Sequence, residues 1–169
     1  MSNSIKREQH DNVLTIIFDQ ENSVANVFNE ELFTELNEQL QFIEDNQKNY
    51  TGVIFKSAKP AIFIAGADLK SFASNPSPER IEYLIELGQK TFDRIANLKI
   101  PTVAAINGAC VGGGYELALA CDHRVATLDS STKIGLPETM LGILPAWGGS
   151  TRLPRLIGLP AAMGIILAG

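Results

Sequence analysis

The stretch INGACVGGGYELALACD, residues 106–122, joins one short apolar run to another through three consecutive glycines. The glycines are residues 112–114, and Tyr115 and Glu116 follow them directly. The second apolar run has the composition and length of a helix over about residues 115–121. Because glycine disfavours helix, three of them at its start indicate a backbone that turns sharply or approaches another group closely.

Outward from this stretch, apolar strands alternate with segments of helical periodicity. β-Branched and apolar runs predict strands at residues 12–18, 52–57, 100–106 and 123–127, with a short apolar segment at 62–65. Apolar spacing predicts helices at residues 29–46, with Asn29 as N-cap, and at 76–98, with Ser77 and Pro78 at the start. This alternation predicts a single α/β domain. The last segment, LPAAMGIILAG, has the pattern of a helix that stops in mid-course, so we expect the domain to be truncated at its C-terminus.

The composition indicates one globular domain and argues against several kinds of partner. The 169 residues are 45% hydrophobic and carry a formal net charge of -5. Nucleic acids and anionic membranes reward clustered Lys and Arg, and the sequence has no such cluster, so neither is expected as a partner. The first residues lack the apolar core of a signal peptide, and no apolar window is long enough for a membrane span, so neither is expected. Cys110 and Cys121 fit neither a CxxC pair nor a disulfide framework, so we expect buried thiols in a cytoplasmic protein.

The glycine-rich stretch does not match the common nucleotide or hydrolase motifs. A dinucleotide fingerprint GxGxxG needs a further glycine three residues on, and a P-loop needs a GK[ST] ending. A serine-hydrolase elbow needs GxSxG, whereas Ser150 stands in GGST. No His, Cys and Asp cluster has the spacing of metal ligands, so we expect no metal.

The alternative is that the glycines expose backbone amides. The first amides of a helix have no partner within it and lie at the positive end of its dipole. They are therefore suited to stabilise an oxygen that becomes negative during a reaction. An oxyanion hole needs a second donor, and the turn at residues 66–68, where a short apolar segment ends in Gly-Ala-Asp, is the candidate.

Two glutamates are candidates for proton transfer. Glu116 lies in the first helical turn, and Glu138 follows a proline in IGLPETMLGILP. Each has a structural interpretation, since the first can offset the helix dipole and the second can cap a turn. Two carboxylates in one partly apolar cleft would instead perturb each other's pKa and divide the roles of general acid and general base. The presence of both glycine turns favours the catalytic interpretation.

The other polar candidates have simpler structural roles. Asp122-His123-Arg124 is expected to form a cap and ion-pair cluster, with polar catalysis as the alternative. Trp147 is expected in the core, with a ligand platform as the alternative. Arg152 and Arg155 are expected on a solvated helix face, with a phosphate contact as the alternative. Lys70 has the same two alternatives, solvation or a phosphate contact.

Three blocks of sequence, taken together, resemble the enoyl-CoA hydratase/isomerase (crotonase) superfamily. They are AGADLKSF at residues 65–72, INGACVGGGYELALACDHRVAT at 106–127 and IGLPETMLGILPAWGGSTRLPRLIG at 134–158. The similarity is greatest to the hydratase domain of multifunctional fatty-acid oxidation α subunits. It implies a crotonase-like spiral of ββα units that occupies residues 1–169 and is incomplete at the C-terminus.

The resemblance also implies a reaction and its residues. The amides of Ala67 and Gly113 would form the oxyanion hole for the thioester oxygen, and Glu116 and Glu138 would handle the water and the α-proton. The substrate would contact Ala65, Gly66, Asp68 and Leu69. The implied activity is hydration of a trans-2-enoyl-CoA thioester in β-oxidation, with no cofactor beyond the coenzyme A of the substrate. The alternatives are isomerisation of the double bond and an inactive fragment that binds CoA or a partner subunit. The expected assembly is a homo-oligomer or a β-oxidation complex.

Overall fold

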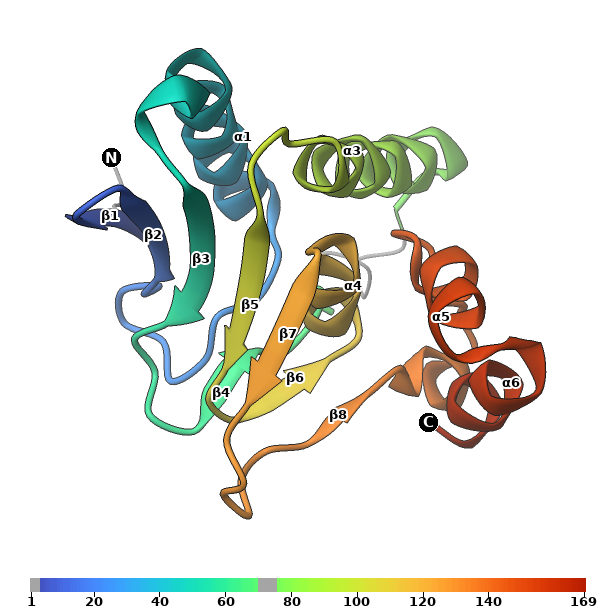
Figure 1. Ribbon diagram of the computed structural model, residues 1–169. Coiled ribbons are helices and arrows are strands. Elements are labelled where there is room, and N and C mark those ends of the chain that lie inside the picture. Colours follow the sequence, from blue (N-terminus) through green and yellow to red (C-terminus); the bar gives the residue numbers. More distant parts are fainter. Residues whose placement is uncertain (1–3, 70–75) are drawn as a thin grey trace.

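The computed structural model describes residues 4–69 and 76–169, and it shows an α/β fold with two sheets (Figure 1). The larger sheet has the strand order β1-β2-β3-β5-β7. Its strands are β1 (Ile5–His10), β2 (Val13–Phe18), β3 (Gly52–Ser57), β5 (Thr102–Ile106) and β7 (His123–Ala126). Only the first pair is antiparallel, and the other neighbours are parallel.

The smaller sheet is parallel and has the order β4-β6-β8. Its strands are β4 (Ile62–Ile64), β6 (Ala109–Val111) and β8 (Ile134–Gly135). A parallel bridge between Phe28 and Ala67 lies just beyond β4. This bridge fixes the turn that contains Ala67.

The helices are α1 (Glu30–Asn46), α3 (Pro78–Ala96), α4 (Gly113–Ala120), α5 (Gly149–Ile157) and α6 (Leu159–Ala168), with 3₁₀ turns η1 (Gln47–Asn49) and η2 (Pro137–Leu141). The successive units β3-β4-α3 and β5-β6-α4 each contribute one strand to the larger sheet and one to the smaller sheet, followed by a helix. The unit β7-β8-η2 continues the same progression. The predicted α/β spiral of ββα units is therefore confirmed.

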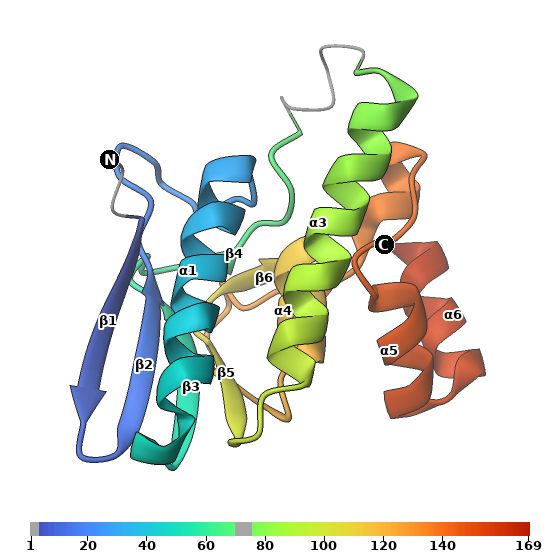
Figure 2. The same ribbon diagram turned by 90° about the horizontal axis from the view of Figure 1, so that it is seen from above.

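Local signals placed the long helices correctly. The Asn29 side chain accepts a hydrogen bond from Leu32 N at 2.8 Å and so caps α1, as predicted. The Ser77 side chain caps α3 in the same way by accepting from Arg80 N. Figure 2 shows α1 and α3 side by side, and they pack against each other. Each helix buries one apolar stripe in the main core.

An aromatic cluster joins these helices to the segment before α5. The indole of Trp147 meets the rings of Phe28, Phe33 and Phe92 edge to face, with centroid distances of 5.8, 5.1 and 6.0 Å. Trp147 is 6% exposed, so its predicted core position is confirmed. α5 and α6 lie at the end of the molecule opposite β1 (Figures 1 and 2).

The structure corrects the predicted elements in four places. β1 precedes the strand expected to be first, and β6 and β8 were not predicted. β1 is polar because only Ile5 of its residues is buried, while β6 and β8 contain three and two residues. α4 begins at Gly113 rather than near Tyr115, so two glycines belong to its first turn.

Candidate active site

Each of the three glycines before Tyr115 meets a different steric requirement. Gly112 is the N-cap of α4 and has a φ of 55°, in the left-handed region that glycine adopts most easily. A Cβ on Gly113 would lie 2.4 Å from Cζ3 of Trp147, and a Cβ on Gly114 would lie 2.2 Å from the carbonyl oxygen of Ile64. The glycines therefore let the start of α4 pack directly against an indole and a strand end.

The two glycine-rich turns lie against each other. Gly66 has a φ of 97°, and a Cβ built on it would lie 3.2 Å from Val111 O and 3.6 Å from Gly113 N. A side chain at residue 66 would thus enter the space between the turns. The structure brings the Gly66-Ala67-Asp68 turn and the start of α4 together, as the oxyanion hypothesis requires.

The backbone amides of these turns are oriented by their neighbours. Phe28 N donates to Gly66 O, and Asp68 N donates to Phe28 O, both at 2.8 Å. In a parallel ladder the residue between two such bonds directs its own N–H away from the partner segment, so the Ala67 amide faces away from Phe28. Gly113 is the first residue of α4, and its amide has no partner within the helix. These two amides remain the candidate oxyanion donors.

A turn distant in sequence holds Glu116. Its Oε1 accepts hydrogen bonds from Trp147 N and Gly149 N, both at 2.8 Å. Gly148 lies between these donors with a φ of 114°, which allows two amides two residues apart to point at one oxygen. Glu116 is 2% exposed, so its carboxyl is fixed in a buried position and does not simply offset the helix dipole at the surface.

The surroundings of Glu116 shift its acidity toward neutral pH. Burial is the largest cause and raises the pKa of Glu116 to about 7. The negative charge of Glu138 raises the pKa further, whereas the amides of Gly149 and Trp147 and the charge of Arg152 oppose the shift. The Glu138 charge thus acts on the Glu116 carboxyl, whereas burial is the cause that raises the pKa of Glu138.

Glu138 lies over Gly112, directly before the first residue of α4. It belongs to η2 and is 8% exposed, and burial raises its pKa above the usual value. A Cβ on Gly112 would lie 3.2 Å from Glu138 Oε1 and 3.7 Å from Gly66 Cα. Glu138 Oε2 is buried without a hydrogen-bond partner among residues 4–69 and 76–169. An unpaired buried carboxyl oxygen is costly unless water or a ligand binds it, so this atom is a candidate acceptor for one of them.

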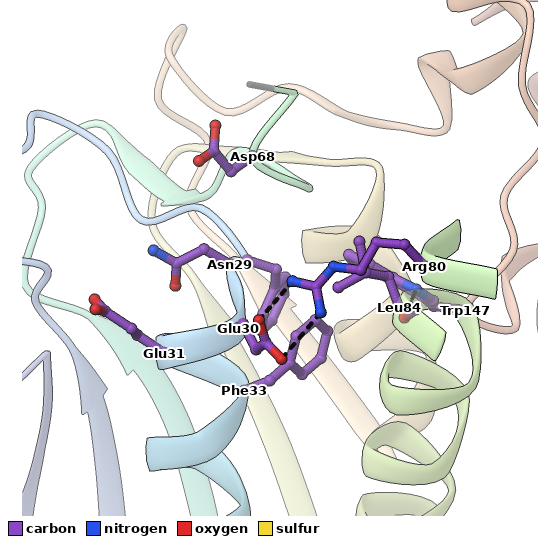
Figure 3. A pocket seen from close by; sticks show the side chains of 9 residues that line it. Asn29, Glu30, Glu31, Phe33, Asp68, Arg80, Leu84 and Trp147 are labelled. Atoms are coloured by element: carbon purple, nitrogen blue, oxygen red, sulfur yellow. Dashed lines mark hydrogen bonds and ion pairs between the residues drawn. The ribbon is translucent and has the colours of Figure 1, made fainter. Parts of the chain in front are cut away.

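Trp147 connects the Glu116 turn to a neighbouring cavity. The cavity has a volume of about 260 Å³ and lies between the starts of α1 and α3, with Phe28, Phe33, Leu84 and Trp147 as its apolar residues (Figure 3). Arg80 of α3 and Glu30 of α1 form a two-bond ion pair beside it. Neither predicted catalytic glutamate lines this cavity.

The other predicted residues have mixed outcomes. Ala65 N donates to Asn26 O at 2.9 Å and so stabilises the turn, while Leu69 is half exposed. Cys110 and Cys121 are free and buried, as predicted. Lys70 lies outside the described residues.

The cluster Asp122-His123-Arg124 has the capping part of its predicted role, but among residues 4–69 and 76–169 its side chains form no ion pair. Asp122 accepts from Thr102 N and Oγ1, and Arg124 donates to the carbonyls of Ala118 and Cys121 at the end of α4. Arg155 is exposed, as expected. The prediction for Arg152 was wrong, because its side chain is only 17% exposed and binds Trp147 O and Asp93.

Sequence reasoning missed the residues that hold Glu116. The Trp147 and Gly149 amides come from a segment more than 30 positions away in the sequence. The sequence shows two glycines at residues 148 and 149, but nothing local indicates which group the neighbouring amides bind. Within residues 4–69 and 76–169, no group of three or more His, Cys, Asp and Glu side chains is arranged to hold a metal ion. No helix in this described part of the chain is long and apolar enough to span a membrane.

Comparisons with known proteins agree with this fold. Residues 8–169 match the enoyl-CoA hydratase/isomerase family. The fatty acid oxidation complex subunit alpha of Aliivibrio fischeri is 46% identical over 154 residues, which are 91% of this chain and 22% of that protein. The crystal structure of an enoyl-CoA hydratase from Bacillus anthracis is 37% identical, with a TM-score of 0.90 over 99% of this chain and 63% of that one. An enoyl-CoA hydratase/carnithine racemase from Magnetospirillum magneticum is 27% identical, with a TM-score of 0.90 over 100% of this chain and 62% of that one.

The two-sheet spiral and these structural neighbours define a crotonase-type α/β fold. The chain belongs to the enoyl-CoA hydratase/isomerase family. It spans about a fifth of the length of the curated α subunit and slightly less than two thirds of the two solved chains.

Proposed function

We propose that this chain hydrates trans-2-enoyl-CoA thioesters to 3-hydroxyacyl-CoA in fatty-acid β-oxidation. The observation that carries the proposal is the pair of buried carboxyls, Glu116 and Glu138, beside two glycine turns that lie against each other. Membership of the enoyl-CoA hydratase/isomerase family supports the reaction class, and the similarity to fatty acid oxidation α subunits supports the pathway.

In the proposed reaction, the thioester oxygen accepts hydrogen bonds from the amides of Ala67 and Gly113. Attack on the double bond moves negative charge onto this oxygen, so donors fixed in advance stabilise the enolate more than the substrate. Each such donor typically contributes about 3 kcal/mol to stabilisation of the transition state.

The two glutamates share the proton transfers. One carboxylate takes a proton from water as the water oxygen bonds to Cβ, and the electron pair of the double bond shifts to form the enolate. The other, protonated carboxyl then donates its proton to Cα. The pKa of Glu116, raised to about 7, suits this division because a carboxyl of that acidity exchanges protons readily near neutral pH. Glu138 Oε2, which lacks a described partner, provides a position for the water.

The substrate is proposed to bind along the turn that precedes α3. Gly66 keeps this turn close to α4, and Ala65, Asp68 and Leu69 extend it on either side of Ala67. The amides of Ala65 and Asp68 already stabilise the turn, so the substrate would contact mainly its exposed surface. The coenzyme A portion belongs to the substrate, and the proposed reaction requires no further cofactor.

The same groups are suited to a second reaction, isomerisation of an enoyl-CoA double bond, since proton shuttling over a stabilised enolate uses the same donors and carboxyls. For assembly we propose a homo-oligomer or a place in a β-oxidation complex. Exposed apolar side chains on η2, α5 and α6 support association; they include Met140, Leu141, Leu156, Leu159 and Leu167. The free thiols of Cys110 and Cys121 support a reducing, cytoplasmic location.

Hydration of crotonyl-CoA, followed by the loss of enoyl absorbance, tests the proposal. We expect turnover by the parent and a fall in kcat of about 100-fold or more in both Glu116→Gln and Glu138→Gln. Glu38→Gln, at an exposed position of α1, is the matched control and should retain the parent rate. Undiminished turnover in either folded site variant would refute the two-acid mechanism. A folded parent that binds crotonyl-CoA without hydrating or isomerising it would instead establish the non-catalytic alternative.

The oxyanion hole needs a separate test because Gly113→Pro would place its Cβ against Trp147. We would bind carbonyl-labelled crotonyl-CoA to the Glu116→Gln/Glu138→Gln protein and measure its thioester stretch by infrared spectroscopy. Two amide donors should lower the stretching frequency relative to that in water. An unshifted band from bound substrate would contradict the assignment of Ala67 and Gly113.

A further inference from the structure

Arg152 binds the back of the turn that holds Glu116. Its Nη1 donates to Trp147 O at 3.0 Å, while the amide of the same residue, Trp147 N, donates to Glu116 Oε1. The guanidinium also occupies the space beside Gly148, where a Cβ would lie 1.9 Å from Arg152 Nη1. Arg152 therefore packs against the residue between the two amides that hold Glu116.

Asp93 fixes Arg152 from a different helix. Arg152 Nη2 donates to Asp93 Oδ1 at 2.6 Å, and this ion pair links α5 to α3. The Arg152 side chain is 17% exposed, whereas that of Asp93 is 67% exposed. A planar guanidinium can bind a carbonyl and a carboxylate at once, so Arg152 is held in one position.

We propose that Arg152, held by Asp93, is a positioning residue that keeps the Trp147–Gly149 turn in register with Glu116. The effect on Glu116 stands on the contacts above, and its consequence for turnover rests on the proposed hydratase function. Arg152 contacts neither predicted oxyanion donor, so it would act through Glu116 rather than on the substrate.

The charges around Glu116 make this role specific. Glu138 of η2 raises the pKa of Glu116, and Arg152 of α5 is the cation that lowers it. The nearby ionic group of α3 is Asp93, which is already paired with Arg152. On β7, Arg124 instead caps the C-terminal end of α4, opposite the end that contains Glu116. Without Arg152, no cation would oppose the effect of the Glu138 charge on the pKa of Glu116.

Carboxyl carbon NMR of the full chain, labelled with ¹³C-glutamate, tests the inference directly. The Glu116 resonance is identified by its absence from Glu116→Gln, and its titration is compared among four proteins. These are the parent, Arg152→Gln, Arg152→Lys and Asp93→Ala. Arg155→Gln is the matched control because Arg155 is exposed on the same helix.

We expect Arg152→Gln to raise the Glu116 pKa, because it removes a cation and frees the turn whose amides hold the carboxylate. Arg152→Lys should raise it less, because it keeps the charge but loses the planar fork. Asp93→Ala keeps the Arg152 cation and removes the carboxylate that holds it. It should loosen the Trp147–Gly149 turn without a comparable rise in the pKa of Glu116. In crotonyl-CoA hydration, kcat of Arg152→Gln should fall about tenfold or more while KM changes little.

The outcomes separate this inference from the proposed function. If the parent shows no hydration but Arg152→Gln still shifts the Glu116 titration, the hydratase proposal fails and the positioning role stands. If the titration in folded Arg152→Gln matches that of the parent and Arg155→Gln, the inference is overturned. Should Arg152→Gln fail to fold, Arg152→Lys and Asp93→Ala decide: parent-like titration and kcat in both would overturn it.

Discussion

Glu116→Gln is expected to remove a large part of the pH dependence of folding stability. In the folded chain the pKa of Glu116 is raised to about 7 from an ordinary value of 4.5. Between these two pH values the folded carboxyl keeps a proton that the unfolded chain has lost. The free energy of unfolding therefore decreases as the pH rises through this window, in total by about 3 kcal/mol. Below this pH window both states are protonated, so the destabilisation is absent.

Glutamine is a suitable replacement because it removes the charge and retains the shape. Its side-chain oxygen can still accept from Trp147 N and Gly149 N. The quantity compared is the difference in the free energy of unfolding between the variant and the parent. From about pH 4 to about pH 8, we expect this difference to change by about 3 kcal/mol in favour of the variant. Urea unfolding at several pH values provides the measurement, with the fluorescence of Trp147, the only tryptophan, as the probe.

Glu38→Gln provides the control because its side chain contacts water before and after unfolding. Its curve of stability against pH should run parallel to that of the parent. A constant difference between Glu116→Gln and the parent across the whole range would refute the reasoning, since it would mean that burial does not perturb the Glu116 carboxyl.

Three further substitutions test the packing around the site, each by urea unfolding. Asn29→Ala should lower the free energy of unfolding by about 1 kcal/mol because it removes the α1 cap, and an unchanged midpoint would contradict the capping role. Gly114→Ala should destabilise the fold by roughly 1–3 kcal/mol because its Cβ meets the β4 carbonyl, while Gly164→Ala, with open space around it, should not. Gly88→Ala should also destabilise by about 1–3 kcal/mol and change the emission of Trp147, since its Cβ would lie 2.4 Å from the indole; an unaltered spectrum would argue against that contact.

Local sequence was sufficient to predict the elements whose stability depends on nearby residues. The Asn29 and Ser77 caps act within one helical turn, so the starts of α1 and α3 could be predicted. The strands β2 and β3 are rich in apolar and β-branched residues and were also found. Strands β1 and β8 were missed for different reasons. β1 is polar along an exposed edge although its partner β2 follows it directly, and β8 has only two residues and pairs with the distant β6.

The sequence by itself placed Glu116 at a glycine-rich helix start and Glu138 after a proline, and the resemblance proposed their roles. Tertiary structure alone decided that Trp147 and Gly149 amides hold Glu116, that Glu138 lies over Gly112, and that Arg152 is drawn inward. The physical reason is that burial and electrostatic coupling depend on distances through space. Segments far apart in the chain must pack together before a carboxyl loses water or senses a neighbouring charge.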